Sequence, residues 1–204
     1  MRSKTKIDKS LTIDKAKKKK KKKDNQLDPN FDKLLFDAIN KVRADPSAWS
    51  EKVLEMIQHI QKDAKTGKLF LSPKEGTKIG LINGEEGIKQ AAFILKNTKP
   101  MQALQLSEAL LVELPQNPEM RFKKEGMLEV LEKLKEKPNF NAKNIFFNVD
   151  KGIYDPLLCL MTQIIDDTNF KGKRRENILN PNFTQIGITS SKDENFGCYL
   201  TFSP

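Results

Sequence analysis

The stretch "YDPLLCLMTQIID" (residues 154–166) gives the clearest indication of the architecture, because as a helix it would be apolar on nearly every face. Such a helix must be packed on more than one side, so this segment is expected at the centre of the protein. Downstream, the spacing of apolar residues changes from that of a helix to that of a strand. "FTQIGIT" (183–189) and "GCYLTFS" (197–203) predict two strands joined by the polar turn "SSKDEN" (190–195). A buried helix followed by a terminal strand pair predicts an α+β fold, with helices packed around a small antiparallel sheet.

Upstream of this segment the apolar spacing is helical. Asp45 is expected to cap the second of these helices, and Pro46 suits its first turn. The intervening residues 61–83 are polar and contain glycine, so they predict a loop with one short strand, "KLFLS" (68–72). The helical stretches are "FDKLLFDAINKVR" (31–43), "ADPSAWSEKVLEMIQHI" (44–60), "GEEGIKQAAFILKNT" (84–98), "LSEALLVEL" (106–114) and "GMLEVLEKLKEK" (126–137).

The charge of the chain is concentrated at its N-terminus. Residues 1–30 hold twelve Lys and Arg against four Asp, whereas the remaining residues hold 25 basic and 23 acidic side chains. Within the tail, seven consecutive lysines repel one another, and no aromatic residue accompanies them, so we expect this segment to be disordered when free. The predicted organisation is a polybasic tail over 1–30 and one folded domain over 31–204.

Several classes of protein have no support in the sequence. No apolar run of 18 residues occurs, and the N-terminus has no apolar signal core, so we expect an intracellular protein that is not secreted. Cys159 and Cys198 are then interpreted as reduced, buried residues. Together with the single histidine, His59, they are too few for a zinc site. No glycine-rich nucleotide motif is present, so neither a metal nor a cofactor is expected.

The stretch "LLFDAINKVRADPSAW" (34–49) contains the pattern Asn-x-x-Arg-x-x-Pro, and "RRENILNPNFTQIGI" (174–188) contains Arg-x-Asn-Ile-Leu. Together with two further segments they resemble the CAP superfamily, also called SCP-like proteins, which opens with the first pattern and has His-Arg-x-Asn-Ile-Leu as the second. "AKNI" (142–145) looks like Gly-Glu-Asn-Ile, and "LQLSEALLVEL" (104–114) like a helix that normally ends with a histidine. The resemblance implies a CAP-like α-β-α sandwich with a cleft above the sheet.

Family members often hold two histidines and two acids in that cleft, and each position can be carried onto this chain. The first histidine falls near Asn117, the glutamate on Lys143 and the second histidine on Arg174. Asp166 and Asp167 lie near the place of the other acid. Lysine and arginine repel a divalent ion, and arginine cannot act as a general base. The resemblance therefore implies a degenerate cleft and a pseudoenzyme without catalytic residues, metal or small-molecule substrate.

Alternatives remain for this region. "RRENIL" also fits a basic turn in an unrelated α+β fold. Asp166 and Asp167 are expected as a solvent-facing pair at a helix end, although with Glu176 they would be the acids of a relocated hydrolase or metal site.

The lysine run is the strongest functional signal. Clustered lysines bind anionic surfaces by releasing counterions, and without aromatic neighbours they cannot stack on bases. The leading hypothesis is an intracellular interaction or scaffold module, in the cytoplasm or on a microtubule or ciliary structure, tethered to an acidic protein surface such as the tubulin tail. Nucleic acid, anionic lipid, a nuclear-import signal or a merely solubilising tail also fit, and the second hypothesis is a lipid-binding CAP-like module. The lysines of the run are Lys17, Lys18, Lys19, Lys20, Lys21, Lys22 and Lys23.

Overall fold

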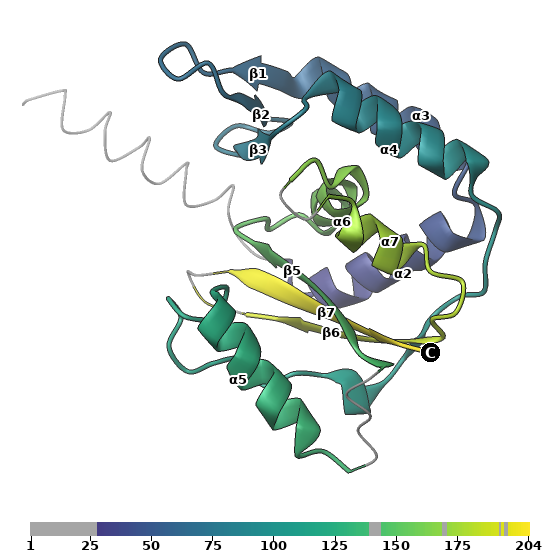
Figure 1. Ribbon diagram of the computed structural model, residues 1–204, viewed down its shortest axis with the longest axis vertical. Coiled ribbons are helices and arrows are strands. Elements are labelled where there is room, and N and C mark those ends of the chain that lie inside the picture. Colours follow the sequence, from purple (N-terminus) through teal and green to yellow (C-terminus); the bar gives the residue numbers. More distant parts are fainter. Residues whose placement is uncertain (1–27, 139–143, 169–170, 192, 194–195) are drawn as a thin grey trace, which may run out of the picture.

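Helices and strands both occur along the chain, so the prediction of an α+β fold is confirmed (Figure 1). The computed structural model describes residues 28–138, 144–168, 171–191, 193 and 196–204. The polybasic tail lies outside these residues except for positions 28–30. The first described helix begins at Phe31, where the folded domain was expected to begin.

The elements have the following bounds. The α-helices are α2 (Phe31–Ala44), α3 (Ala48–Leu54), α4 (Glu85–Asn97), α5 (Lys124–Lys135), α6 (Pro156–Ile165) and α7 (Lys173–Ile178), with short 3-10 helices at Glu55–His59 and Glu108–Leu110. The strands are β1 (Ile60–Lys62), β2 (Leu69–Leu71), β3 (Ile79–Leu81), β4 (Gln105–Leu106), β5 (Phe146–Lys151), β6 (Gln185–Ser190) and β7 (Gly197–Ser203).

The larger sheet has the strand order β4-β6-β7-β5. The two predicted C-terminal strands form its centre as an antiparallel pair, with Ile188 opposite Leu200. β5 adds to β7 in the same antiparallel sense, whereas β4 runs parallel to β6. The sheet is therefore mixed rather than purely antiparallel, because the segment after α4 approaches β6 from the same direction.

Alternation along β7 places a separate core on each face of this sheet. Cys198, Leu200 and Phe202 belong to the principal core, together with residues of α2, α4 and α6. Tyr199 points to the other face, where it joins Val130 and Leu134 of α5 in a smaller core. Figure 1 accordingly has α5 on one side of the sheet, α2, α6 and α7 on the other, and α3 with α4 beyond them.

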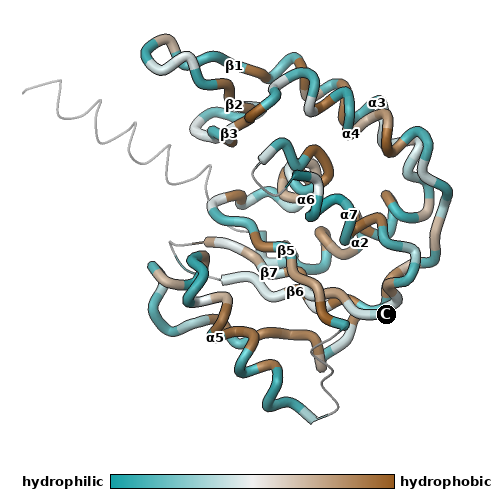
Figure 2. Tube along the Cα trace, viewed as in Figure 1, coloured by the Kyte–Doolittle hydropathy of each residue, from teal (hydrophilic) through white to brown (hydrophobic). Residues whose placement is uncertain are grey.

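α6 is the central helix that its composition predicted. Residues 158–165 are all buried. Asp155 caps its N-terminus by accepting a hydrogen bond from the Leu158 amide (2.8 Å), and Pro156 occupies the first turn. Figure 2 shows this brown, hydrophobic segment inside the molecule, whereas the loop that joins β1 to β2 is hydrophilic.

α2 is joined to the sheet by two polar side chains of the "NKVR" motif. The Asn40 side chain accepts from the Leu104 amide (2.8 Å) and donates to the Leu104 carbonyl (3.1 Å). Arg43 is fully buried. Its guanidinium donates to the carbonyl oxygens of Gln102, Ile178, Asn180 and Phe183 at 2.8–3.0 Å. Asn40 and Arg43, which belong to the segment that resembles the CAP opening, therefore have a structural role.

Three segments differ from expectation. The predicted helix over 44–60 is an α-helix only over Ala48–Leu54 and continues as the 3-10 helix Glu55–His59. Residues 60–81 form a three-stranded antiparallel sheet, β1-β2-β3, of which only β2 was predicted. The predicted helix over 106–114 is wrong beyond the 3-10 turn at Glu108–Leu110, because this segment instead bonds to the β6 segment through Ser107 N and Ile186 O (2.9 Å). The approach is so close that a Cβ on Gly187 would lie 2.2 Å from the Leu110 carbonyl oxygen.

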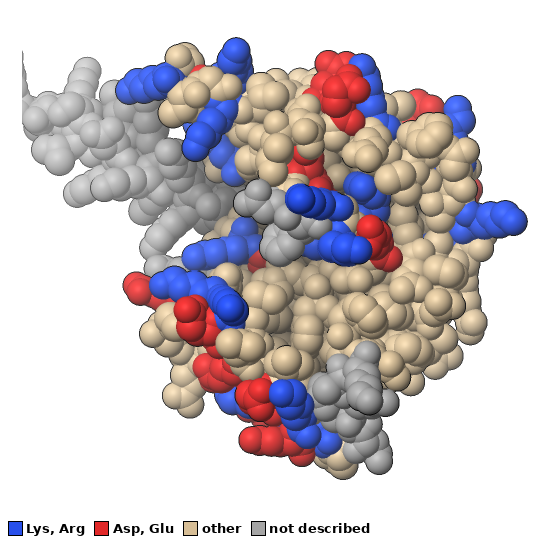
Figure 3. Space-filling model, viewed as in Figure 1, with Lys and Arg blue, Asp and Glu red and all other residues tan. Residues whose placement is uncertain are grey.

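The surface of the folded part carries charges of both signs. On the face in Figure 3, blue and red side chains alternate over α5, where Lys133 and Lys135 pair with Glu129 and Glu132. Among the described helices, none is both long enough and apolar enough to cross a membrane.

Candidate functional site

The structure places the predicted site residues in three different settings. Lys143 and the lysine run 17–23 lie outside the described residues. Asn117 is exposed in a turn, where its side chain accepts a hydrogen bond from the Glu119 amide (3.0 Å). Asn117 is not among the residues that line the main cleft. Only Asp166 and Arg174 are brought together.

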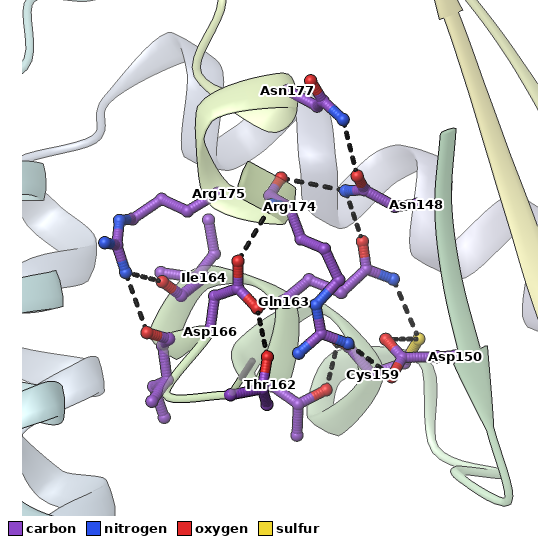
Figure 4. Close-up of polar contacts among 12 residues, drawn as sticks. Asn148, Asp150, Cys159, Thr162, Gln163, Ile164, Asp166, Arg174, Arg175 and Asn177 are labelled. Atoms are coloured by element: carbon purple, nitrogen blue, oxygen red, sulfur yellow. Dashed lines mark hydrogen bonds and ion pairs between the residues drawn. The ribbon is translucent and has the colours of Figure 1, made fainter. Parts of the chain in front are cut away.

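Arg174 is held by two carboxylates (Figure 4). Its Nε donates to Asp166 Oδ1 at 2.7 Å, and its backbone amide donates to Asp166 Oδ2 at 2.9 Å. Its Nη1 donates to Asp150 Oδ1 at 2.9 Å. The side chain of Arg174 is only 7% exposed, and that of Asp166 is fully buried. The two hydrogen bonds between Arg174 and Asp166 replace the water that these charged groups lose on burial.

The left-handed end of α6 creates this pair. Asp166 has φ 44° and ψ 38° at the C-terminus of α6, which turns the chain so that its carboxylate meets the first turn of α7. The expectation that Asp166 and Asp167 face solvent at a helix end is therefore wrong: both lie at the end of α6, but both are buried. The next arginine, Arg175, donates from Nη1 to the carbonyls of Ile164 and Ile165 (2.8 Å each).

Asp167 faces away from this ion pair and anchors the start of α4. Its carboxylate accepts hydrogen bonds from the backbone amides of Ile82, Asn83 and Gly84, the shortest at 2.7 Å. A Cβ on Gly87 would lie 2.5 Å from the Asp167 carboxyl carbon, so glycine is required for this approach. Asp167 thus fixes the three residues that lead into α4, and its carboxylate is already occupied by their amides.

Burial and charge oppose each other at the Arg174 cluster. Burial raises the pKa of Asp150, although the adjacent Arg174 guanidinium counteracts the rise. Burial also lowers the pKa of Arg174, but the carboxylates of Asp150 and Asp166 outweigh it, so the pKa is raised overall. Arg174 consequently stays protonated at all physiological pH values and cannot accept a proton in catalysis.

A line of buried amides continues from the ion pair. The Asn148 side chain donates to Gln163 Oε1 (2.8 Å) and to the Arg174 carbonyl (2.9 Å). Asn177 in turn donates to Asn148 Oδ1 at 2.8 Å. These residues link β5, α6 and α7. Sequence reasoning missed Asn148, Asp150 and Gln163, although a polar residue inside an otherwise apolar segment was the signal that could have found them.

Two thiols complete the cluster. The Cys159 Sγ, on α6, lies 3.6 Å from the Cys198 Sγ, on β7, and 3.7 Å from Asp150 Oδ2. Both cysteines are fully buried and free, as was predicted. The hydrogen bond with Cys198 and burial raise the pKa of the Cys159 thiol well above its usual value.

A cleft of about 1000 Å³ opens beside the cluster. Asp150, Thr162 and Arg174 are among the residues that line it, and the loop after β2 forms another wall. An ion pair between Lys74 of that loop and Asp155 at the start of α6 joins the two sides. The cleft is therefore bordered by the ion pair between Arg174 and Asp150.

The described residues do not assemble the alternative site of Asp166, Asp167 and Glu176. Glu176 is exposed and pairs with Lys173 at 2.6 Å, while the two aspartates serve Arg174 and α4. Within the described part of the chain, no group of three His, Cys, Asp or Glu could hold a metal ion.

Comparisons with family models, curated proteins and solved structures find no match to this chain.

Proposed function

We propose that the protein is a non-catalytic interaction module with a CAP-like fold. The observation that carries this proposal is the state of Arg174, the position that the resemblance assigns to a histidine. Its guanidinium is part of a buried ion-pair network with Asp150 and Asp166. A permanently charged group held in this way stabilises the packing of α6, α7 and β5, and it supplies neither a general base nor a metal ligand.

The tail supplies the attachment in this proposal. Residues 1–30 carry a net charge of +8, whereas the rest of the chain carries only +2. Seven adjacent lysines, Lys17–Lys23, can neutralise an array of carboxylates and release their counterions. The folded domain then acts as the unit that is held at the surface and that docks by shape.

An acidic protein surface is the partner class that fits best. The tail contains no aromatic residue to stack on nucleobases, so nucleic acid would be bound without selectivity. A carboxylate-rich, extended tail such as that of tubulin would place the protein in the cytoplasm, on a microtubule or a ciliary structure. Anionic lipid is the second candidate, since lysine runs also bind acidic membranes.

The test is binding of the full chain to immobilised polyglutamate, to duplex DNA and to vesicles with and without phosphatidylserine. We expect binding to polyglutamate that weakens at least roughly tenfold between about 50 mM and about 200 mM salt, because it depends on released counterions. Replacing Lys17–Lys23 by Gln should abolish this binding.

A matched variant controls for total charge. It replaces by Gln the same number of exposed lysines on the folded domain, and it should bind as the unchanged protein does. Equal losses in both variants would contradict the assignment to the tail. Preferential binding to DNA or to acidic vesicles would replace the protein partner by nucleic acid or lipid. The control lysines are Lys33, Lys41, Lys62, Lys65, Lys68, Lys96 and Lys99.

A further inference from the structure

The two cysteines of the chain meet in the middle of the principal core. They are 39 positions apart in sequence, and their elements, α6 and β7, pack face to face, so that the Sγ atoms lie 3.6 Å apart. Cys198 sits in the central strand, opposite Asp150 of β5 on one side and Ser190 of β6 on the other. Both residues are 0% exposed. From the sequence, both cysteines were interpreted as reduced, buried residues, and nothing local showed that they meet.

We propose that Cys159 and Cys198 are a covalent modification site, which a hydroperoxide converts to an intramolecular disulfide. A disulfide has an S–S bond of about 2.0 Å, so the sulfurs must approach by about 1.6 Å. The sulfur of Cys159 also makes polar contacts with the side chains of Asp150 and Gln163, at 3.7 and 3.6 Å. Side-chain rotation with a small backbone adjustment can supply a movement of this size. This inference does not depend on the proposed function.

The cleft gives a small oxidant a route to the pair. Asp150 lines the cleft and contacts the Cys159 sulfur with its Oδ2 atom. The Asp150 carboxylate is therefore in contact with both the cleft and the thiol. Hydrogen peroxide is little larger than water, so we expect it to reach the thiol past this side chain during local motion.

The chemistry balances with hydrogen peroxide as the only oxidant. Cys159 passes its proton to Asp150 Oδ2, its hydrogen-bond acceptor, and the sulfur attacks one peroxide oxygen. The O–O bond breaks, and the departing oxygen takes the proton from Asp150 and leaves as water. The resulting sulfenic acid is attacked by the Cys198 sulfur, the S–S bond forms, the S–O bond breaks, and a second water leaves with the Cys198 proton. The two thiols are oxidised and the peroxide is reduced.

The environment makes this reaction slow. A buried thiol with a raised pKa is rarely a thiolate, and the thiolate is the reactive species. We therefore expect oxidation over minutes to hours rather than the rapid turnover of a peroxidase. Once formed, the bond joins α6 to β7 and closes a loop of about 40 residues in the unfolded chain, which should raise the melting temperature by roughly 10 °C.

The experiment exposes the full chain to hydrogen peroxide and follows its intact mass. Samples are denatured and alkylated at each time to reveal remaining thiols. We expect a species that has lost two hydrogens, takes up no alkylating agent, yields a cross-linked 159–198 peptide and returns to the starting mass with a thiol reductant. Its melting temperature should rise by the amount given above.

Cys159→Ala and Cys198→Ala are the matched variants. Neither can form the bond, so neither should show the mass loss or the thermal shift after the same treatment. The proposal is overturned if the unchanged protein keeps two alkylatable thiols, gains oxygen without cross-linking, or forms only intermolecular dimers. The peptide map of the unchanged protein decides the question even where a variant fails to fold.

Discussion

Arg43 and Arg174 are both buried, and different groups replace the water that each guanidinium loses. Arg43 joins α2 to the chain before β6 and donates only to backbone carbonyl oxygens, from Gln102, Ile178, Asn180 and Phe183. Arg174 joins α7 to α6 and β5 and pairs with the carboxylates of Asp166 and Asp150. The first cluster contains one charge, and the second contains three.

The pKa shifts reflect this difference. Burial lowers the pKa of Arg43 to about 10, because carbonyl dipoles do not fully replace the lost water. At Arg174 two carboxylates outweigh burial and raise the pKa. Both arginines are charged at neutral pH, but only the Arg174 cluster contains partners that titrate. The stability that Arg43 contributes should therefore be independent of pH across the acidic range, whereas that of Arg174 should not.

The largest expected effect is that of Arg43→Met. Four carbonyl oxygens would lose their donor inside the protein, and each unsatisfied acceptor costs about 1–3 kcal/mol where water cannot replace it. We expect a loss of roughly 5 kcal/mol in the free energy of unfolding, measured by urea denaturation, with the same loss at pH 5 and at pH 7.5. Lys41→Met, an exposed position on the same helix, should change stability by less than about 0.5 kcal/mol.

Arg174→Met is expected to destabilise by roughly 3–4 kcal/mol at neutral pH, because it leaves two buried carboxylates without a cation. Burial already raises the pKa of Asp150, and this variant lacks the Arg174 guanidinium whose charge counteracts the rise. The penalty should therefore be present at high pH and shrink as the pH falls through the folded-state pKa of Asp150. Denaturation between pH 4.5 and pH 8 measures it. A penalty that does not change with pH would mean that Arg174 acts through packing alone.

Asp150→Asn should have the smallest effect of the three, below about 1.5 kcal/mol, because the amide oxygen can still accept from Arg174. Burial raises the pKa of Asp150 in the folded protein, so its contribution to stability is present below the unfolded pKa and is lost as the pH rises through the folded pKa. The variant lacks this titration. Its stability should fall less steeply than that of the unchanged protein across this window, and identical pH profiles would contradict the assignment.

Some elements of the fold could be predicted from the sequence and others could not. The helices over 31–43, 84–98, 126–137 and 154–166 and the two C-terminal strands follow from local apolar spacing, and all six are present. The helix over 106–114 was wrong, because pairing with the β6 segment outweighs its helical pattern. The strands β1, β3 and β5 carried too little alternation to be recognised before a partner strand was known.

The candidate site was predicted only in part. The sequence alone showed that position 174 is cationic and that the single histidine, His59, is far from it along the chain. Asp150 could not be connected with it, since the two are 24 positions apart and lie on β5 and α7. The orientation of Asp166 and Asp167 was also unpredictable, because it depends on the left-handed conformation at the end of α6.

Amino-acid order and composition were enough to predict the fold class, the burial of α6, the strand pair at the C-terminus and the separation of a basic tail from a nearly neutral domain. These properties depend on composition and on spacing within single elements. Other contacts became visible only in the folded protein: Arg174 pairs with Asp150 and Asp166, Asp167 bonds to the amides before α4, and Cys159 meets Cys198. Each of these contacts joins different elements of the fold. The protonation and reactivity of a buried charge or thiol depend on the neighbours that replace its water, and these neighbours are known only once the elements are packed together.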